Sequence, residues 1–208
     1  MADLVTRSTA LRRAIRLEWL TVIWMALEAV LAVGAGIAAR SVLLTAFGTD
    51  SIVELLSGAT LLWRLGSEAR ARDSANAERI ENLATRISSV LLLLLCIYVV
   101  LSSIAGLVLR IEPQPSRLGL IISGVAVVAM PWLAWQKRNV NVTLQSPALR
   151  ADVAESATCA YLAGVTLVGV AINALTGWWW VEYVAAIALL RWLVPEAREA
   201  FESARGTS

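Results

Sequence analysis

Two acidic residues, Asp50 and Glu54, stand four positions apart inside a long apolar stretch of the sequence. On an α-helix, residues at this spacing lie on one face, with Cβ atoms about 5–6 Å apart. Carboxylates this close repel each other unless a proton or a cation intervenes. A charge at the centre of a membrane helix also costs about 2.5–3.5 kcal/mol, so such residues face a bundle interior or a wet cavity. The pair therefore indicates an interior site for a cation.

A second pair at the same spacing, Glu155 and Cys159, lies in another apolar stretch. If the two helices face each other, Asp50, Glu54, Glu155 and Cys159 supply three carboxylates and one thiolate. That is a reasonable tetrahedral shell for a divalent transition metal. Carboxylates favour manganese or iron(II) and a thiolate favours zinc or cadmium, so the identity of the metal (zinc, manganese, iron or cobalt) stays open.

Each of these residues also has an ordinary structural interpretation. The Asp50 and Glu54 pair can be neutralised by protons or by an arginine, although we expect no Arg or Lys at comparable depth in any span. Glu155 can be an interfacial acid, and Cys159 a small packing residue.

Other acids are placed less clearly. Glu28, near the centre of the first apolar stretch, either lines an ion or proton pathway or sits protonated against a neighbour. Asp152 either draws cations toward the site or caps the N-terminus of its helix. Glu18 and Glu182 fall near the ends of apolar stretches, where we expect solvated side chains.

The elements that must position these residues are membrane helices. Of the 208 residues, 58% are hydrophobic and only 16% are charged, against about 45–50% apolar in soluble domains. A helix needs about 20 apolar residues to cross a bilayer. Six stretches qualify or nearly do: 17–38, 41–65, 87–109, 118–135, 149–175 and 178–194. We expect an all-α membrane protein with six transmembrane helices over residues 17–194, an N-terminal segment over 1–16 and a short tail over 195–208.

The distribution of basic residues predicts the orientation. All but three of the 18 lysines and arginines fall in the N-terminal segment, in the links 66–86 and 136–148, in the C-terminal tail or at the adjoining span ends. The exceptions are Arg40, Arg110 and Arg117. Because cytoplasmic loops carry the excess of basic residues, both termini are expected in the cytoplasm of a multi-pass protein of the cell (inner) membrane.

Composition excludes several classes of function. The chain has no histidine, which removes Ser-His hydrolysis and His-ligated zinc catalysis, and it lacks a D-G-x-x-A-R diphosphate-binding motif. A net charge of +2 without a basic face gives no basis for nucleic-acid binding. We expect no enzyme and no cofactor.

At these residues the sequence resembles the cation diffusion facilitator family. Asp50-x-x-x-Glu54 is similar to that family's D-x-x-x-D, and Ala151-Asp152-x-x-Glu155-x-x-x-Cys159 to its A-D-x-x-H-x-x-x-D. The likeness extends over roughly 26–205. It implies six helices with both ends cytoplasmic and a homodimer. It also implies exchange of a divalent metal ion (zinc, manganese, iron, cobalt or cadmium) for protons.

The departures from the family pattern are specific. Glu155 replaces His or Asp, Cys159 and Glu54 each replace Asp, and the family's metal-binding domain after the sixth helix is not found. The leading hypothesis is proton-coupled efflux by alternating access at a site between the second and fifth helices. The alternatives are a non-transporting sensor or assembly partner that kept the fold, and export of organic cations bound by the paired acids and Trp24.

Overall fold

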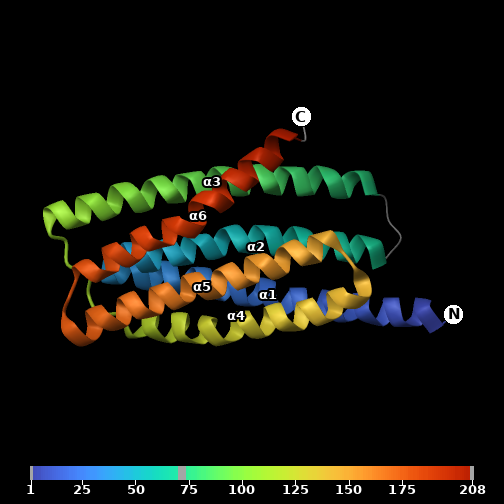
Figure 1. The fold of residues 1–208 in the computed structure, drawn as a ribbon, viewed down its shortest axis with the longest axis horizontal. Coiled ribbons are helices and arrows are strands. Elements are labelled where there is room, and N and C mark those ends of the chain that lie inside the picture. The colour runs from blue at the N-terminus through green and yellow to red at the C-terminus, as the bar shows by residue number, and fades with distance from the viewer. Residues whose placement is uncertain (1, 70–73, 207–208) are drawn as a thin grey trace.

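The structure, a computed structural model, describes residues 2–69 and 74–206. The described residues form six long helices (Figure 1). They are α1 (Ala2–Ala39), α2 (Val42–Ala69), α3 (Ser74–Leu109), α4 (Arg117–Leu144), α5 (Pro147–Thr176) and α6 (Trp180–Gly206). The all-α fold expected from the apolar stretches is confirmed. Helix also extends through most of the segments 1–16 and 195–208 that flank the predicted spans.

Five helices, α1 to α5, contain stretches within the described residues that are long and apolar enough to cross a membrane. The helix α6 is not among them. Its apolar run 183–190 is bracketed by Glu182 and Arg191, which shortens the uncharged part of the helix. The chain is therefore a multi-pass membrane protein, and the sixth crossing remains a prediction.

The helices are longer than the predicted spans, and the difference matters most between α4 and α5. The predicted link 136–148 shrinks to residues 145 and 146, because α4 continues to Leu144. Gln145 takes a left-handed conformation with φ 51°, and the Ser146 side chain accepts a hydrogen bond from the Leu149 N–H as the N-cap of α5. A helix satisfies its own backbone hydrogen bonds, so polar residues can prolong it beyond the apolar run. Lys137 thereby moves from the expected loop into a helix.

The packing places α2 at the centre of the molecule. It contacts α1, α3, α5 and α6, whereas α4 packs against α1 and α5. In Figure 1, α1, α2, α4 and α5 lie together, and α3 with the C-terminal part of α6 lies to one side of them. One end of the bundle holds the start of α1 and the α4–α5 turn, and is called here the N-terminal end. The opposite end holds the α1–α2 turn and the links 110–116 and 177–179.

Apolar side chains cover the surface of the bundle, and several charged side chains lie in its interior. Large apolar side chains are exposed around the bundle, for example Val30 on α1, Leu94 on α3 and Val128 on α4. Several charged side chains are buried instead. Because lipid solvates apolar groups and cannot hydrogen-bond, this arrangement suits a protein surrounded by membrane.

Candidate functional site

The two acids of α2 both face the interior. Asp50 is 2% exposed and Glu54 8% exposed, one helical turn apart. Their helix is the one with the most neighbouring helices, so the turn between them is enclosed by protein. The one-face arrangement that the spacing predicts thus projects into the bundle and away from lipid.

Cys159 of α5 reaches the same region and meets an acid of α1. Its Sγ donates a hydrogen bond to Glu28 Oε1 at 3.7 Å, and Ser51 Oγ of α2 donates to the same oxygen at 2.7 Å. Glu54, Glu28 and Asp50 all act electrostatically on the thiol. Three helices therefore bring five side chains together as a central cluster, made of Glu28, Asp50, Ser51, Glu54 and Cys159. The Glu28 carboxylate belongs to it through direct contacts, and its Oε2 is buried without a hydrogen-bond partner.

Glu155 lies one turn before Cys159 on α5 and is only partly buried. The hydroxyl oxygen of Ser57 is 3.0 and 2.8 Å from its two carboxylate oxygens, which links α5 to α2. The fourth residue of the predicted ligand set is thus held by a serine next to the central cluster.

Nearer the N-terminal end lies a buried group of charges from three helices. The Lys137 ammonium of α4 is 2.6 Å from Asp152 Oδ2 of α5 and 3.1 Å from Glu18 Oε2 of α1. The side chains of Lys137 and Glu18 are both fully buried. Two expectations from the sequence are wrong here: Glu18 is not solvated, and Lys137 does not lie in a polar link but is buried in a helix. The N-cap of α5 is Ser146, so Asp152 does not serve as the cap.

The sequence contains one signal that could have located Lys137. Ser146-Pro147 is a typical helix start, with serine as N-cap and proline in the first turn. Reading the fifth helix from residue 147 leaves 136–144 to the preceding helix. Lys137 then falls two turns before the end of that helix, where a long side chain can reach the interior.

At the opposite end Glu182 is also buried, contrary to the solvated position expected for it. It accepts hydrogen bonds from the Ser41 hydroxyl and, at 2.7 Å, from the Asn173 amide. The same amide nitrogen donates to the Pro113 carbonyl at 3.1 Å. A neutral hydrogen-bonded group therefore surrounds this acid, because α6 turns its first helical residues toward α2 and α5.

Buried polar groups thus occur at intervals along the whole length of the bundle. From the N-terminal end they are the triad of Glu18, Lys137 and Asp152, then Glu155 with Ser57, then the central cluster, then Glu182. Within the described part of the chain, six acids are buried against one base, Lys137. The buried acids are Glu18, Glu28, Asp50, Glu54, Asp152 and Glu182.

The side chains of the predicted ligand set do not form a complete metal-binding site in the structure. Among the described residues, no three Cys, Asp or Glu side chains lie close enough to hold one metal ion. The structure therefore places Asp50, Glu54 and Cys159 in one interior region, with Glu28 in contact and Glu155 one turn away. Closing around an ion requires these side chains to approach one another.

The family of the chain can be identified from its similarity to known proteins. No curated protein matches the chain significantly. The sequence profile of the cation efflux transmembrane domain matches residues 19–204, which is nearly the whole chain. The matched range contains α2 and α5 entirely, together with Glu28 and Lys137. With its long apolar helices and its acid-rich interior, the chain belongs to the cation efflux family.

Proposed function

We propose that this protein exports divalent transition-metal cations across a membrane in exchange for protons, and that the central cluster holds the ion in transit. The membership in the cation efflux family supports a cation transporter. The choice of divalent metals, the proton coupling and the site are inferences from the residues.

The observation that carries the proposal is the imbalance of buried charge. Six acids and one lysine are buried in the described part of the bundle, and three of the acids surround the Cys159 thiol. A carboxylate buried in a low-dielectric interior is costly in its charged form, so it takes up a proton or pairs with a cation. An interior of this composition alternates naturally between a protonated and a cation-bound state.

The ligands come from two, and with Glu28 three, helices. Asp50 and Glu54 of α2 and Cys159 of α5 form the centre of the set, with Glu155 as the fourth ligand that the sequence pattern predicts. Glu28 is a pathway or proton-coupling residue in contact with Cys159. Because carboxylate and thiolate ligands bind metal in their deprotonated forms, binding releases protons. Movement of α2 and α5 against their neighbours then exposes the ion to the other side, where protons displace it.

Two further features belong to the same proposal. The basic residues gathered at the N-terminal end support a cytoplasmic location for that end, in a protein of the cell membrane. The family resemblance favours a homodimer as the working unit. The direction of net transport is set by the ion and proton gradients.

Metal-dependent proton flux in proteoliposomes tests the proposal. Wild-type protein is expected to release protons when zinc, manganese, iron(II) or cobalt is supplied, and Asp50→Asn and Glu54→Gln are expected to lower the initial rate at least tenfold. Glu112→Gln is the matched control, because Glu112 is an exposed acid in the 110–116 link. Equal flux in wild type and Asp50→Asn would contradict the assignment of the site.

Calorimetric titration of the same proteins separates transport from sensing. Tight metal binding that depends on Asp50 but produces no flux would favour a non-transporting sensor. Competition of an organic cation against metal would favour the third hypothesis, in which Trp24, one turn before Glu28 on α1, takes part.

A further inference from the structure

Lys137 joins two helices, α1 and α5, whose backbones are not close neighbours in the described structure. Among the described residues α1 and α5 are not close neighbours at the level of the backbone, whereas α4 contacts both. The ammonium of Lys137 lies between Glu18 of α1 and Asp152 of α5, at 3.1 and 2.6 Å. One side chain from α4 therefore holds the facing sides of α1 and α5 at a fixed separation.

The triad lies between the N-terminal end of the bundle and the central cluster. Asp152 precedes Glu155 by one turn and Cys159 by two turns on the same helix. Since a helix rises 1.5 Å per residue, the triad lies about 10 Å from Cys159 along α5, toward the N-terminal end. Polar side chains of α1 and α5 are linked at two levels, at the triad and at the contact of Glu28 with Cys159. A cation moving between these helices from the N-terminal end would therefore meet Lys137 before the central cluster.

The ion pairs of the triad are of a kind that a competing cation can break. One ammonium faces two carboxyl groups, so it can neutralise only one of them at a time. Within the described residues, the Lys137 nitrogen has no hydrogen bond beyond these two ion pairs, and the Glu18 and Asp152 carboxyl groups also interact with each other. Buried ion pairs recover their desolvation cost only when such additional bonds are present. A competing cation at either acid therefore meets a partner that is incompletely satisfied.

We propose that Lys137 is a latch: its ammonium on Glu18 and Asp152 closes the path between the N-terminal end and the central cluster, and its release opens that path. This inference rests on the proposed function, since a path is needed only if a cation passes. It assigns Lys137 a positioning role, distinct from the residues that contact the ion. At the opposite end the buried acid Glu182 is instead held by Ser41 and Asn173.

Cys159 is a natural reporter for this latch. It is buried, and within the described residues the other free cysteine is Cys96, so Cys96→Ser leaves one reactive thiol. Membrane vesicles of defined orientation are treated from each side with a membrane-impermeant methanethiosulfonate, and the rate of Cys159 modification is followed by mass spectrometry. In the Cys96→Ser background, Lys137→Met is expected to raise the rate from the N-terminal side at least tenfold and to leave the rate from the other side unchanged.

A second variant keeps the test decisive if Lys137→Met fails to fold. The triple change Glu18→Gln, Lys137→Met and Asp152→Asn removes all three charges at nearly constant volume. The latch predicts that this protein folds and shows the same faster modification from the N-terminal side. Glu182→Gln is the matched control for a buried polar group at the opposite end, and it should leave access from the N-terminal side unchanged.

The outcomes separate the latch from the proposed function. A folded triple variant with wild-type modification rates on both sides overturns the latch, and so does a triple variant that cannot fold, because the charges would then serve structure alone. Faster modification in variants of a protein that carries no metal leaves the latch standing and removes the transport proposal. Metal flux in the wild type, with unchanged Cys159 modification in the variants, keeps the transport proposal and removes the latch.

Discussion

At the scale of single residues, Cys159 is the departure that most affects the chemistry of the site. It stands where the resembled motif carries aspartate, and it is buried against Glu28 with Glu54 and Asp50 nearby. A thiolate is a softer ligand than a carboxylate and favours zinc and cadmium over manganese. The metal preference of this protein should therefore depend on this one side chain.

We predict that Cys159→Ser lowers the affinity for zinc about tenfold, or ~1.4 kcal/mol, and changes the affinity for manganese much less. Calorimetric titration of the purified protein with both metals measures the difference. Cys96→Ser is the matched control, because Cys96 is another buried cysteine but on α3, which carries no residue of the proposed ligand set. An equal loss for both metals in Cys159→Ser would remove the thiol from the ligand set.

The roles of Glu28 and Glu155 can be separated in the same way. Glu28 Oε1 contacts Cys159 and Ser51, and its Oε2 has no hydrogen-bond partner in the described structure. The Glu155 carboxylate is held by Ser57. Within the central cluster, Glu28 Oε2 has no hydrogen bond to give up before it meets an ion, whereas both Glu155 oxygens must first leave the serine.

Glu28→Gln is therefore expected to reduce metal-dependent proton flux more strongly than Glu155→Gln. Initial rates in proteoliposomes, at matched amounts of folded protein, provide the comparison. The reverse order would favour the ligand set drawn from the sequence pattern alone.

At the scale of helices, the triad sets how α1, α4 and α5 are held together. Removing one partner from a buried ion pair leaves an uncompensated charge and costs about 3–5 kcal/mol, whereas replacing the whole pair with neutral groups of similar volume is often neutral. Lys137→Met should destabilise the protein by about 3–5 kcal/mol. The triple neutral variant should recover most of that loss. Equilibrium unfolding in mixed micelles measures both, and a Lys137→Met protein as stable as wild type would show that the buried charges do not depend on the lysine.

The close approach of α1 and α2 depends on glycine. A Cβ added at Gly48 would lie 2.6 Å from the Val33 backbone nitrogen and 2.9 Å from the Ala32 Cβ, so neither neighbour can rotate away. Small residues at such positions let membrane helices pack backbone to backbone. Since Asp50 and Ser51 lie two and three residues later on α2, this contact also sets their distance from Glu28 on α1.

Gly48→Ala is expected to destabilise the protein by about 1–3 kcal/mol, the usual cost of overpacking. Gly66→Ala is the control in the same helix, because a Cβ there meets nothing within 4 Å. That change should be neutral or slightly stabilising, since alanine favours helix over glycine. Mixed-micelle unfolding compares the two, and equal stabilities would place α1 and α2 further apart than described.

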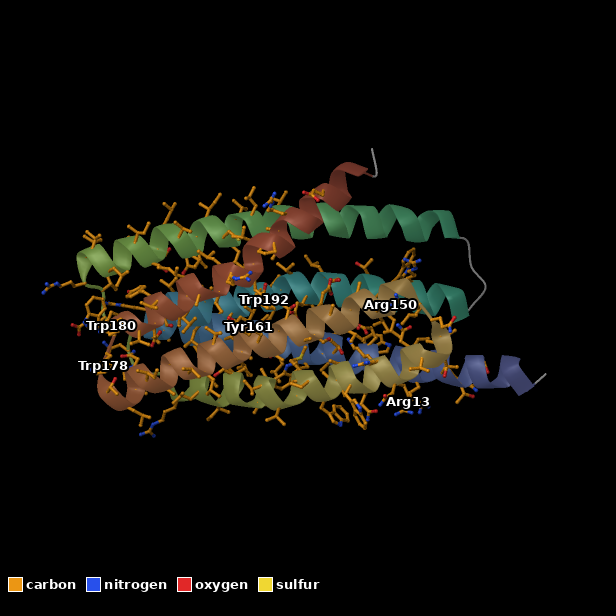
Figure 2. All side chains as sticks on the ribbon, in the orientation of Figure 1. Arg13, Arg150, Tyr161, Trp178, Trp180 and Trp192 are labelled. Carbon is orange, nitrogen blue, oxygen red and sulfur yellow. The ribbon has the colours of Figure 1, made fainter. Side chains whose placement is uncertain are left out.

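At the scale of the whole molecule, the two ends of the bundle differ in character. Figure 2 shows Arg13 and Arg150 toward the N-terminal end and Trp178 and Trp180 at the opposite end, where their rings stack with centroids 6.0 Å apart. Basic residues at one end match the cytoplasmic side, and tryptophan is favoured at a membrane interface. Along the middle of the bundle Tyr161 and Trp192 stack at 4.7 Å between α5 and α6.

We predict that tags at the two termini lie on the same, cytoplasmic side of the membrane. Six crossings return the chain to the side on which it began, and the basic residues fix which side that is. Protease accessibility of the two tags in intact cells and in inverted vesicles measures this. Tags on opposite sides would show that α6, with Glu182 and Arg191 in its sequence, does not cross.

The sequence by itself determined the helical fold and the membrane setting, and it placed Asp50 and Glu54 on one helix face. These follow from local rules: long apolar runs must be helical in lipid, and residues four apart share a helix face. Residues far apart in the sequence were placed only by the tertiary structure. Lys137, expected in a loop, is paired inside the bundle with Glu18 and Asp152. Hydropathy cannot show such a pairing, because it scores each charge as a cost, and only the packing of α1, α4 and α5 brings the compensating partners together.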